Sequence, residues 1–228
     1  MNSRNFPKLN WLAVVLVLHI TFLLISDATA AKIVMVLGYP VSISVLYFPI
    51  TYILADIITE VYGYKIARQI LWMSIICSAV AGTVYQLAAY YPPAFPFEGG
   101  GDPYNTVFAV VLRVMVAGWI AVFAGDISNN YVLAKLKVAT KGAHFWLRAI
   151  ASTFVGQFVN TVIFYIIALY GILPNKILLV AIISGWLMKV GVEVILLPVT
   201  YKVVAYLKRV EGVDTYDFDT DFNPFLFK

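Results

Sequence analysis

Apolar residues dominate this chain in six long runs, which are separated by short segments rich in polar residues, glycine or proline. A run of about 20 mostly apolar residues is long enough to cross a hydrocarbon core of about 30 Å as an α-helix. The pattern therefore predicts an all-α integral membrane protein, with residues 1–228 forming a single bundle of six transmembrane helices. The expected spans are about 10–30, 44–62, 66–90, 106–127, 145–170 and 177–201.

The segments between these runs carry residues that end helices or form turns. In KIVMVLGYPV (residues 32–41), β-branched residues flank Gly38, which predicts a short hairpin at the membrane surface. Pro92 and Pro93 end the third span, because proline cannot continue the hydrogen bonding of a helix. Residues 211–228 are rich in aspartate and aromatic residues, and we expect this acidic tail to extend into water.

Composition and charge support a membrane protein and argue against two other classes. Hydrophobic residues make up 62% of the chain and charged residues only 12%, with a mean hydropathy of +0.87, whereas soluble domains carry about 25% charged residues. The net charge of +4 does not indicate nucleic-acid binding, because the basic residues lie in short loops and not along one face. The single cysteine, Cys77, excludes a disulfide framework within the chain.

The basic residues also predict the orientation, because short translocated loops are depleted of lysine and arginine. With six spans, twelve of the sixteen basic residues fall on the side that holds both chain ends, and only Lys32 and Lys176 fall on the other. We therefore expect both termini in the cytoplasm and a multi-pass protein of the plasma (inner) membrane.

The remaining two basic residues, Arg113 and Lys189, lie inside predicted spans. An ionisable group at a helix centre costs roughly 2.5 to 3.5 kcal/mol, so it normally faces the bundle interior and has a partner. Arg113, about 10 Å deep at 1.5 Å per residue, can reach the surface or anchor a pocket. Lys189 and Glu193 are four residues apart, so mutual neutralisation and a role in a pocket both stay open.

Other polar residues in the spans share helix faces. Asp56 and Glu60 have i, i+4 spacing, which places both carboxylates on one face, where they need a cation, a proton or a substrate donor between them. Gln157, Asn160 and Phe164 follow at i, i+3 and i+7 and form a polar stripe that ends in an aromatic ring. Such a stripe either bonds neighbouring helices or faces a substrate.

Two further features limit the function and the assembly. The chain contains no phosphate-binding GxxxxGK[ST] loop, no HExxH zinc motif and no GxSxG nucleophile elbow, so we predict no catalytic residue, no metal site, no cofactor and no enzymatic activity. Ala117, Ala121 and Gly125 form a ridge of small residues, which favours packing inside the bundle over a dimer face, although a homodimer stays open.

Four stretches of the chain resemble one family. The most specific is FPITYILADIITEVYGYKIAR (48–68), and GDISNNYVLAKLK (125–137), IASTFVGQFVNTVIF (150–164) and LMKVGVEVILLPVTY (187–201) support it. They are similar to the queuosine precursor transporter family, also named the vitamin uptake transporter family. Asp27 in SDATAAK departs from the family pattern, since relatives tend to carry Asn there.

The resemblance implies a fold and a substrate. The fold is a six-helix bundle similar to the substrate-binding subunits of energy-coupling-factor transporters, but working without an ATPase. The implied substrates are the 7-deazaguanine bases 7-cyano-7-deazaguanine and 7-aminomethyl-7-deazaguanine, imported by alternating access, either by facilitated diffusion or with a proton. A binding subunit that needs a separate ATP-driven module, or a carrier for another small polar heterocycle, is the alternative.

The polar and aromatic residues in the predicted spans suggest how such a base binds. A carboxylate of Asp56, Glu60 or Glu193 can receive the paired N–H donors of the guanine-like edge, amide and cationic groups can meet the acceptor, and a phenylalanine ring can cover the face. The candidate substrate-binding residues are Phe48, Asp56, Glu60, Arg113, Gln157, Asn160, Phe164, Lys189 and Glu193.

Overall fold

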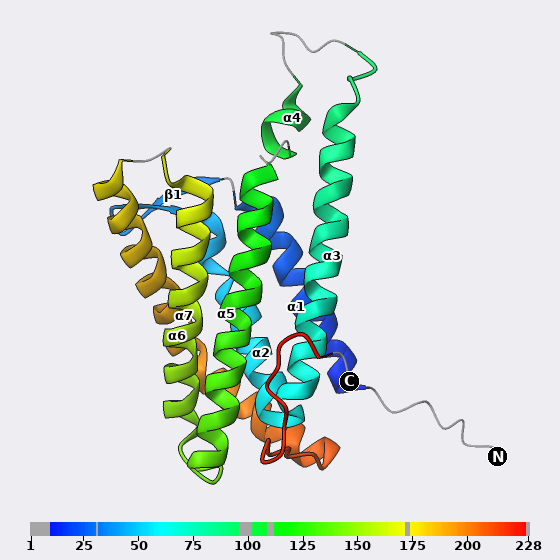
Figure 1. Ribbon diagram of the computed structural model, residues 1–228, viewed down its shortest axis with the longest axis vertical. Coiled ribbons are helices and arrows are strands. Elements are labelled where there is room, and N and C mark those ends of the chain that lie inside the picture. The colour runs from blue at the N-terminus through cyan, green and yellow to red at the C-terminus, as the bar shows by residue number, and fades with distance from the viewer. Residues whose placement is uncertain (1–9, 31, 96–101, 109–111, 172–173, 227–228) are drawn as a thin grey trace, which may run out of the picture.

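The computed structural model describes residues 10–30, 32–95, 102–108, 112–171 and 174–226, and forms a helical bundle with a small sheet at one end (Figure 1). We refer to the end with the sheet as the hairpin end and to the opposite end, where the last helix finishes, as the tail end. The elements in chain order are α1 (Trp11–Thr29), β1 (Ile33–Val36), β2 (Tyr39–Ser42), the 3₁₀ turn η1 (Ile43–Leu46), α2 (Pro49–Tyr62), α3 (Tyr64–Tyr90), α4 (Pro103–Phe108), α5 (Leu112–Ala139), α6 (Phe145–Leu169) and α7 (Asn175–Glu211).

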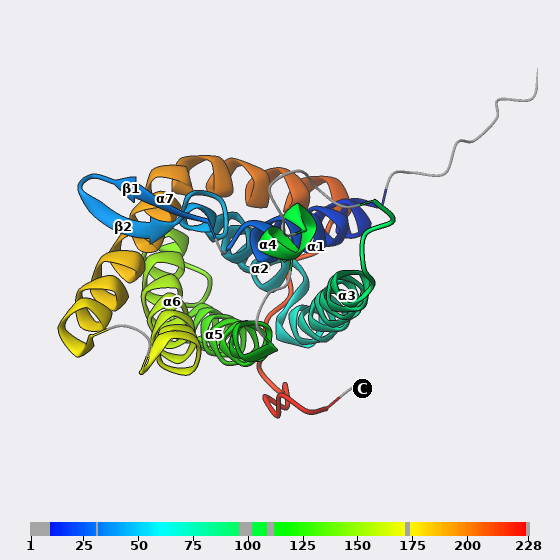
Figure 2. The ribbon, with the colours of Figure 1, turned by 90° about the horizontal axis from the view of Figure 1, so that it is seen from above.

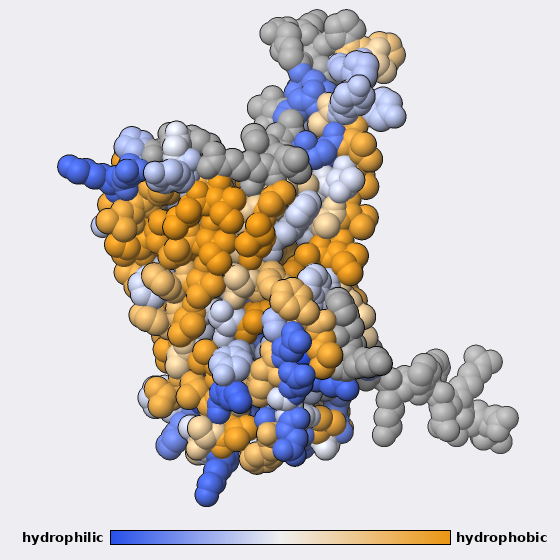
Figure 3. Space-filling view, in the orientation of Figure 1, coloured by the Kyte–Doolittle hydropathy of each residue, from blue (hydrophilic) through white to orange (hydrophobic). Residues whose placement is uncertain are grey.

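The outside of the bundle is apolar, and its inside combines hydrophobic clusters with many buried polar side chains, which is unlike a soluble protein. On α7, Ile195 is 77% exposed while Lys189 and Glu193 are buried. Figure 3 shows hydrophobic residues over the helix surfaces and hydrophilic residues gathered towards the two ends. Within the described residues, four helices, α1, α3, α6 and α7, are long and apolar enough to cross a membrane. The structure therefore supports a multi-pass membrane protein.

Each of the six predicted spans contains helix, but the helix lengths differ from the prediction. Helices α5 and α7 continue to Ala139 and Glu211, beyond the expected ends at about 127 and 201. They continue because polar residues near these ends, such as Lys137, find partners inside the protein. Helix α2 has only 14 residues, a rise of about 21 Å. The count of six membrane crossings therefore stays a prediction.

Helix α2 forms the centre of the bundle. It packs against α1, α3, α5 and α7, and Figure 2 shows it enclosed by the longer helices. Eleven of its fourteen residues are buried. Gly63, with a φ of +86°, ends the helix in a conformation that favours glycine, and the chain turns directly into α3. Because α2 meets little lipid, it can carry Asp56 and Glu60 inside the bundle.

The predicted hairpin at residues 32–41 is confirmed. Strands β1 and β2 pair antiparallel, with Val36 opposite Tyr39. Leu37 and Gly38 between them both have positive φ, +51° and +83°, as a two-residue type I′ turn requires. The Ser42 hydroxyl donates to the backbone oxygen of residue 30 at 2.8 Å, which fixes the hairpin against the end of α1.

Helices α5 and α6 approach closely because glycines meet where they cross. A Cβ atom added to Gly125 would lie 2.7 Å from the Cβ of Asn160, and one added to Gly156 would lie 2.7 Å from the Cβ of Asn129. Small residues allow membrane helices to come this close. Ala117 and Ala121 are also buried, so the small-residue ridge predicted from the sequence packs inside the bundle.

The acidic tail, predicted to extend into water, folds back against the tail end of the bundle, although Asp219 and Asp221 stay exposed. Asp217 is 5% exposed, and its carboxylate accepts the backbone N–H of Tyr64 at 3.1 and 3.2 Å. Arg68 donates to the backbone oxygens of Asp221 and Asn223 at 2.9 and 2.6 Å. The physical reason is that the first N–H groups of a helix have no partner within it, and Asp217 caps α3 from the far end of the chain.

A buried ion cluster joins the helices at the tail end. Arg148 donates two hydrogen bonds to the carboxylate of Glu60, at 2.6 and 3.2 Å, and Lys208 donates a third at 2.7 Å. Lys137 reaches the backbone oxygen of Glu60 and the carboxylate of Asp214, both at 2.5 Å. This cluster connects α2, α5, α6, α7 and the tail through side chains that make several hydrogen bonds each.

The ion pairs of the cluster also change the pKa of Asp214 in the tail. Burial alone would raise the pKa of Asp214, but hydrogen bonds from Lys137 and Lys208 outweigh burial and lower the pKa below its ordinary value of 3.8. The stabilisation that these hydrogen bonds give the folded protein is therefore complete above pH 3.8. It is lost as the pH falls through the lowered pKa of Asp214. It is small, because the side chain is 43% exposed and solvent screens its charge.

The glycine crossing predicts a position-specific loss of stability. Gly125→Ala places a methyl group against Asn160 and Tyr52, and such overpacking typically costs about 1–3 kcal/mol. Thermal unfolding of the purified protein in detergent should show a lower midpoint. Gly191→Ala on α7 is the control, because its Cβ has open space and its midpoint should not fall. Equal midpoints for the two variants would contradict the assigned crossing.

The ion cluster predicts a larger loss of stability than the glycine crossing does. Arg148→Met leaves Glu60 without its bidentate partner, and breaking a buried ion pair typically costs about 3–5 kcal/mol. The unfolding midpoint should drop strongly, whereas the exposed Arg209→Met control should match the wild type. A wild-type midpoint for Arg148→Met would show that the cluster does not hold the bundle.

Candidate functional site

Two cavities adjoin each other at the hairpin end. The first, the hairpin cavity, has a volume of about 520 Å³ and lies among α1, η1, α2, α5, α6 and α7. The second, the α3 cavity, has a volume of about 580 Å³ and lies mainly among α1, α3 and α5. They share Asp27 and Phe164 in their walls.

Lys189 supplies a buried cation to the hairpin cavity. Its Nζ atom donates to the Asn160 side-chain oxygen at 2.9 Å and to the Thr161 hydroxyl at 3.3 Å, and it lies 4.6 Å from the ring centroid of Phe48. Lys189 is 8% exposed. Among the described residues it forms no direct ion pair with Glu193, although the charges of the two groups act on each other.

The hairpin cavity brings together four of the residues selected from the sequence. Phe48, Asn160, Phe164 and Lys189 all line it, although they come from the start of α2, from α6 and from α7. Two aromatic rings, an amide and an ammonium group therefore share one space. This convergence is what a small flat polar ligand requires, because rings cover its faces while polar groups meet its edges.

Asp27 of α1 is the residue that the sequence analysis missed as a site candidate. Its Oδ2 atom accepts the Ser78 hydroxyl at 2.5 Å, and Ser78 in turn accepts the indole N–H of Trp119 at 3.1 Å. Asp27 lines both cavities and so places a carboxylate on the wall they share. A carboxylate at the end of an apolar run was the available signal, but it was noted only as a departure from the family pattern.

Gln157, Glu193 and Asp56 form a second polar layer, nearer the tail end. Gln157 donates to Glu193 at 2.6 Å, and the Thr153 hydroxyl donates to the other oxygen of Glu193. Asn129 donates to Asp56 at 2.6 Å. These carboxylates do not line the hairpin cavity, so the structure separates them from the site that contains Lys189.

The remaining two candidates lie elsewhere. Glu60 belongs to the ion cluster at the tail end, and its oxygens are occupied by Arg148 and Lys208. Asp56 and Glu60 share one helix, as expected, but they face different partners. The side chain of Arg113 lies outside the residues that the structure describes. Among the described residues, no group of three or more His, Cys, Asp or Glu side chains is arranged to hold a metal ion.

Comparison with known proteins gives a consistent picture. Residues 42–203 match the family model described as "Putative vitamin uptake transporter". The "Probable queuosine precursor transporter" of Bacillus subtilis (strain 168) is 26% identical over 177 residues, 77% of each chain. The "Queuosine precursor transporter" of Escherichia coli (strain K12) is 23% identical over 168 residues, which are 74% of this chain and 72% of that protein. No solved structure is significantly similar to this chain.

The match includes the elements that build the hairpin cavity. The family model begins at the end of β2 and continues into α7, so it includes Phe48, Asn160, Phe164 and Lys189. It covers more than half of the chain. The chain therefore belongs to the vitamin uptake transporter family of membrane transport proteins.

Proposed function

We propose that this protein imports the queuosine precursors 7-cyano-7-deazaguanine and 7-aminomethyl-7-deazaguanine across a cell membrane by alternating access, without an ATPase of its own. The relative from Bacillus subtilis is named "Probable queuosine precursor transporter" and the relative from Escherichia coli "Queuosine precursor transporter". The observation that carries the proposal is the hairpin cavity, where Asp27, Lys189 and two aromatic rings share one space.

The chemistry of a 7-deazaguanine base fits these groups. One edge of the base presents two adjacent N–H donors, which a carboxylate accepts well. In this proposal Asp27 receives that edge, in place of the carboxylates of Asp56, Glu60 and Glu193 favoured from the sequence. Lys189 and Asn160 meet the O6 acceptor, and Phe48 and Phe164 cover the ring faces.

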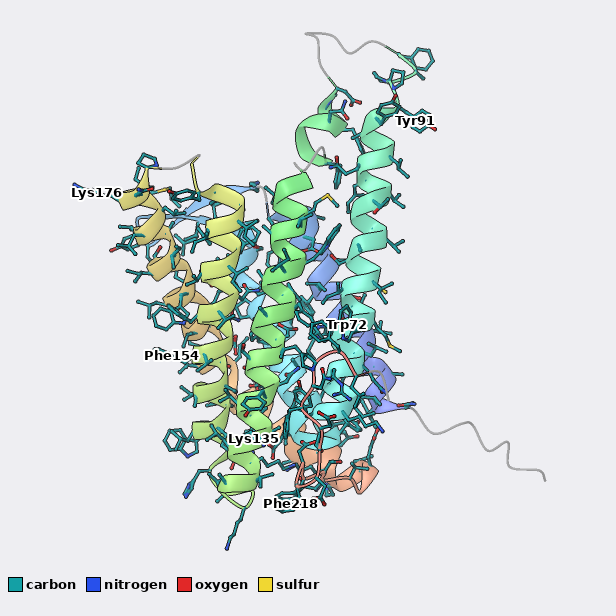
Figure 4. The ribbon with its side chains drawn as sticks, in the orientation of Figure 1. Trp72, Tyr91, Lys135, Phe154, Lys176 and Phe218 are labelled. Atoms are coloured by element: carbon teal, nitrogen blue, oxygen red, sulfur yellow. The ribbon has the colours of Figure 1, made fainter. Side chains whose placement is uncertain are left out.

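The proposed topology has six crossings, with α2 and α5 adding to the four long apolar helices, as in the substrate-binding subunits of energy-coupling-factor transporters. The tail end faces the cytoplasm with both termini, because basic residues favour that side. Lys176 lies at the hairpin end and Lys135 towards the tail end (Figure 4). The two cavities at the hairpin end then face the outside, where a substrate arrives.

Binding of 7-cyano-7-deazaguanine to the purified protein tests the cavity. Lys189→Met removes a charged hydrogen-bond donor, a loss of about 1.5–3 kcal/mol, so calorimetry should show binding weakened roughly tenfold to a hundredfold. Lys176→Met is the matched control, because Lys176 lies on the same helix but is exposed at its hairpin end. Unchanged affinity in Lys189→Met, or no binding by the wild type, would contradict the proposal.

Uptake into liposomes that contain only this protein tests whether it is a complete carrier. We expect external labelled 7-cyano-7-deazaguanine to exchange with unlabelled base inside, with no ATP present. If binding is intact but no exchange occurs, the protein is a substrate-binding subunit that needs a separate ATP-driven module.

A further inference from the structure

Two further carboxyl groups lie on the tail side of the hairpin cavity and have no role in the proposed base site. Glu193 is 6% exposed and Asp56 is 2% exposed. They belong to α7 and α2, and both line a cavity of about 260 Å³, which we refer to as the tail-side cavity. Two carboxyl groups from facing helices therefore share one small space inside the bundle.

Neither carboxyl group forms a direct ion pair with a cation in the described part of the chain. Glu60, in contrast, lies 2.6 and 2.7 Å from two cations. Lys189 is one turn away on α7 but directs its ammonium group to α6. An unpaired buried carboxylate costs several kcal/mol, so such a group takes up a proton instead. This distinguishes the two carboxyls from the paired Glu60.

The two side-chain amides that donate to these carboxyl groups also favour a protonated carboxyl. Asn129 donates to Asp56 and Gln157 donates to Glu193, each at 2.6 Å. The other polar atom of each amide, Oδ1 of Asn129 and Oε1 of Gln157, is buried and has no donor among the described residues. Buried acceptors are nearly always hydrogen-bonded. A protonated carboxyl group can donate an O–H to an amide oxygen, whereas a carboxylate cannot.

The surroundings favour one bound proton over none. The charged groups that act on Glu193 are Asp56 and Lys189. Those that act on Asp56 are Glu60, Asp126 and Arg148. From α2, Tyr52 also faces these groups, as a neutral hydroxyl that donates to the backbone oxygen of Gly156 at 3.4 Å. Two like charges in one cavity repel each other, and a proton on either carboxyl removes the repulsion.

The position of this pair links it to the base site. Lys189 and Glu193 are one turn apart on α7, a rise of about 6 Å, yet Lys189 lines the hairpin cavity and Glu193 the tail-side cavity. Pro198 lies five residues beyond Glu193 on α7 and lacks the N–H that continues the helix, which provides a place where the helix can bend. A movement of α7 therefore acts on both sites together.

We propose that the Asp56–Glu193 carboxyl pair binds one proton that is transported together with the substrate, which makes the protein a proton symporter. This inference rests on the proposed function. The proton leaves a hydronium ion on the hairpin side and forms an O–H bond with one carboxyl oxygen. On the tail side this bond breaks and water accepts the proton. With a neutral base, each cycle then moves one positive charge inward.

The test uses the purified full chain in liposomes, with neutral 7-cyano-7-deazaguanine as the substrate. With the membrane potential held at zero and the lumen one pH unit more alkaline, the wild type should accumulate the base about tenfold, as one proton per base requires. Glu193→Gln and Asp56→Asn should lose this accumulation but keep exchange of labelled for unlabelled base, because exchange needs no net proton movement. The control Asp219→Asn, an exposed tail residue, should accumulate the base like the wild type.

Three results would overturn the inference. The first is equal wild-type uptake with and without the pH gradient, and the second is tenfold accumulation by both variants. The third is accumulation driven by a sodium gradient alone. If a variant does not fold, a pH indicator inside wild-type vesicles decides, since entry of the base must acidify the lumen. Failure of the proposed function looks different, because the wild type would then show no exchange of the base at all.

Discussion

A polar side chain that faces lipid loses its hydrogen bonds, and this constraint decides the arrangement of the whole molecule. The chain places its charged and amide groups on the inner sides of α2, α5, α6 and α7, where they bond to one another. Helix α2 can be short and carry two carboxyl groups because longer helices enclose it. The cavities, the carboxyl pair and the ion cluster all follow from this enclosed polar interior.

Much of the fold could be predicted from the pattern of apolar residues. Runs of about 20 residues marked the long helices, and Gly38 between β-branched residues marked the hairpin. The tail could not be predicted, because its acidic composition is typical of a solvated segment, while its partner, the N–H of Tyr64, lies 153 residues away. The helix ends at Ala139 and Glu211 could not be predicted either. Charged residues usually mark the membrane surface, so the spans were ended before them, and their partners inside the protein lie far away in the sequence.

The candidate site could be predicted in part. The 3.6-residue period placed Gln157 and Asn160 on the inner face of α6, where both are buried. Spacing alone could not show that Asp56 and Glu60 have different partners, because those partners come from α5, α6 and α7. Asp27 was missed as a wall residue because its partner, Ser78, lies 51 residues away on α3. The residue spacing within one helix predicts which side chains share a face, but it does not predict which residues of other helices they contact.

The ion cluster also has a consequence for the order of synthesis. Glu60 emerges from the ribosome long before Arg148 and Lys208, which lie 88 and 148 residues further along the chain. During that interval α2 holds a carboxylate whose final partners do not yet exist, at a cost of several kcal/mol if it is buried in lipid. We therefore expect α2 to wait at the membrane interface, or to be shielded by the insertion machinery, until these partners have been made. The ion cluster can close only after Lys208 has been synthesised.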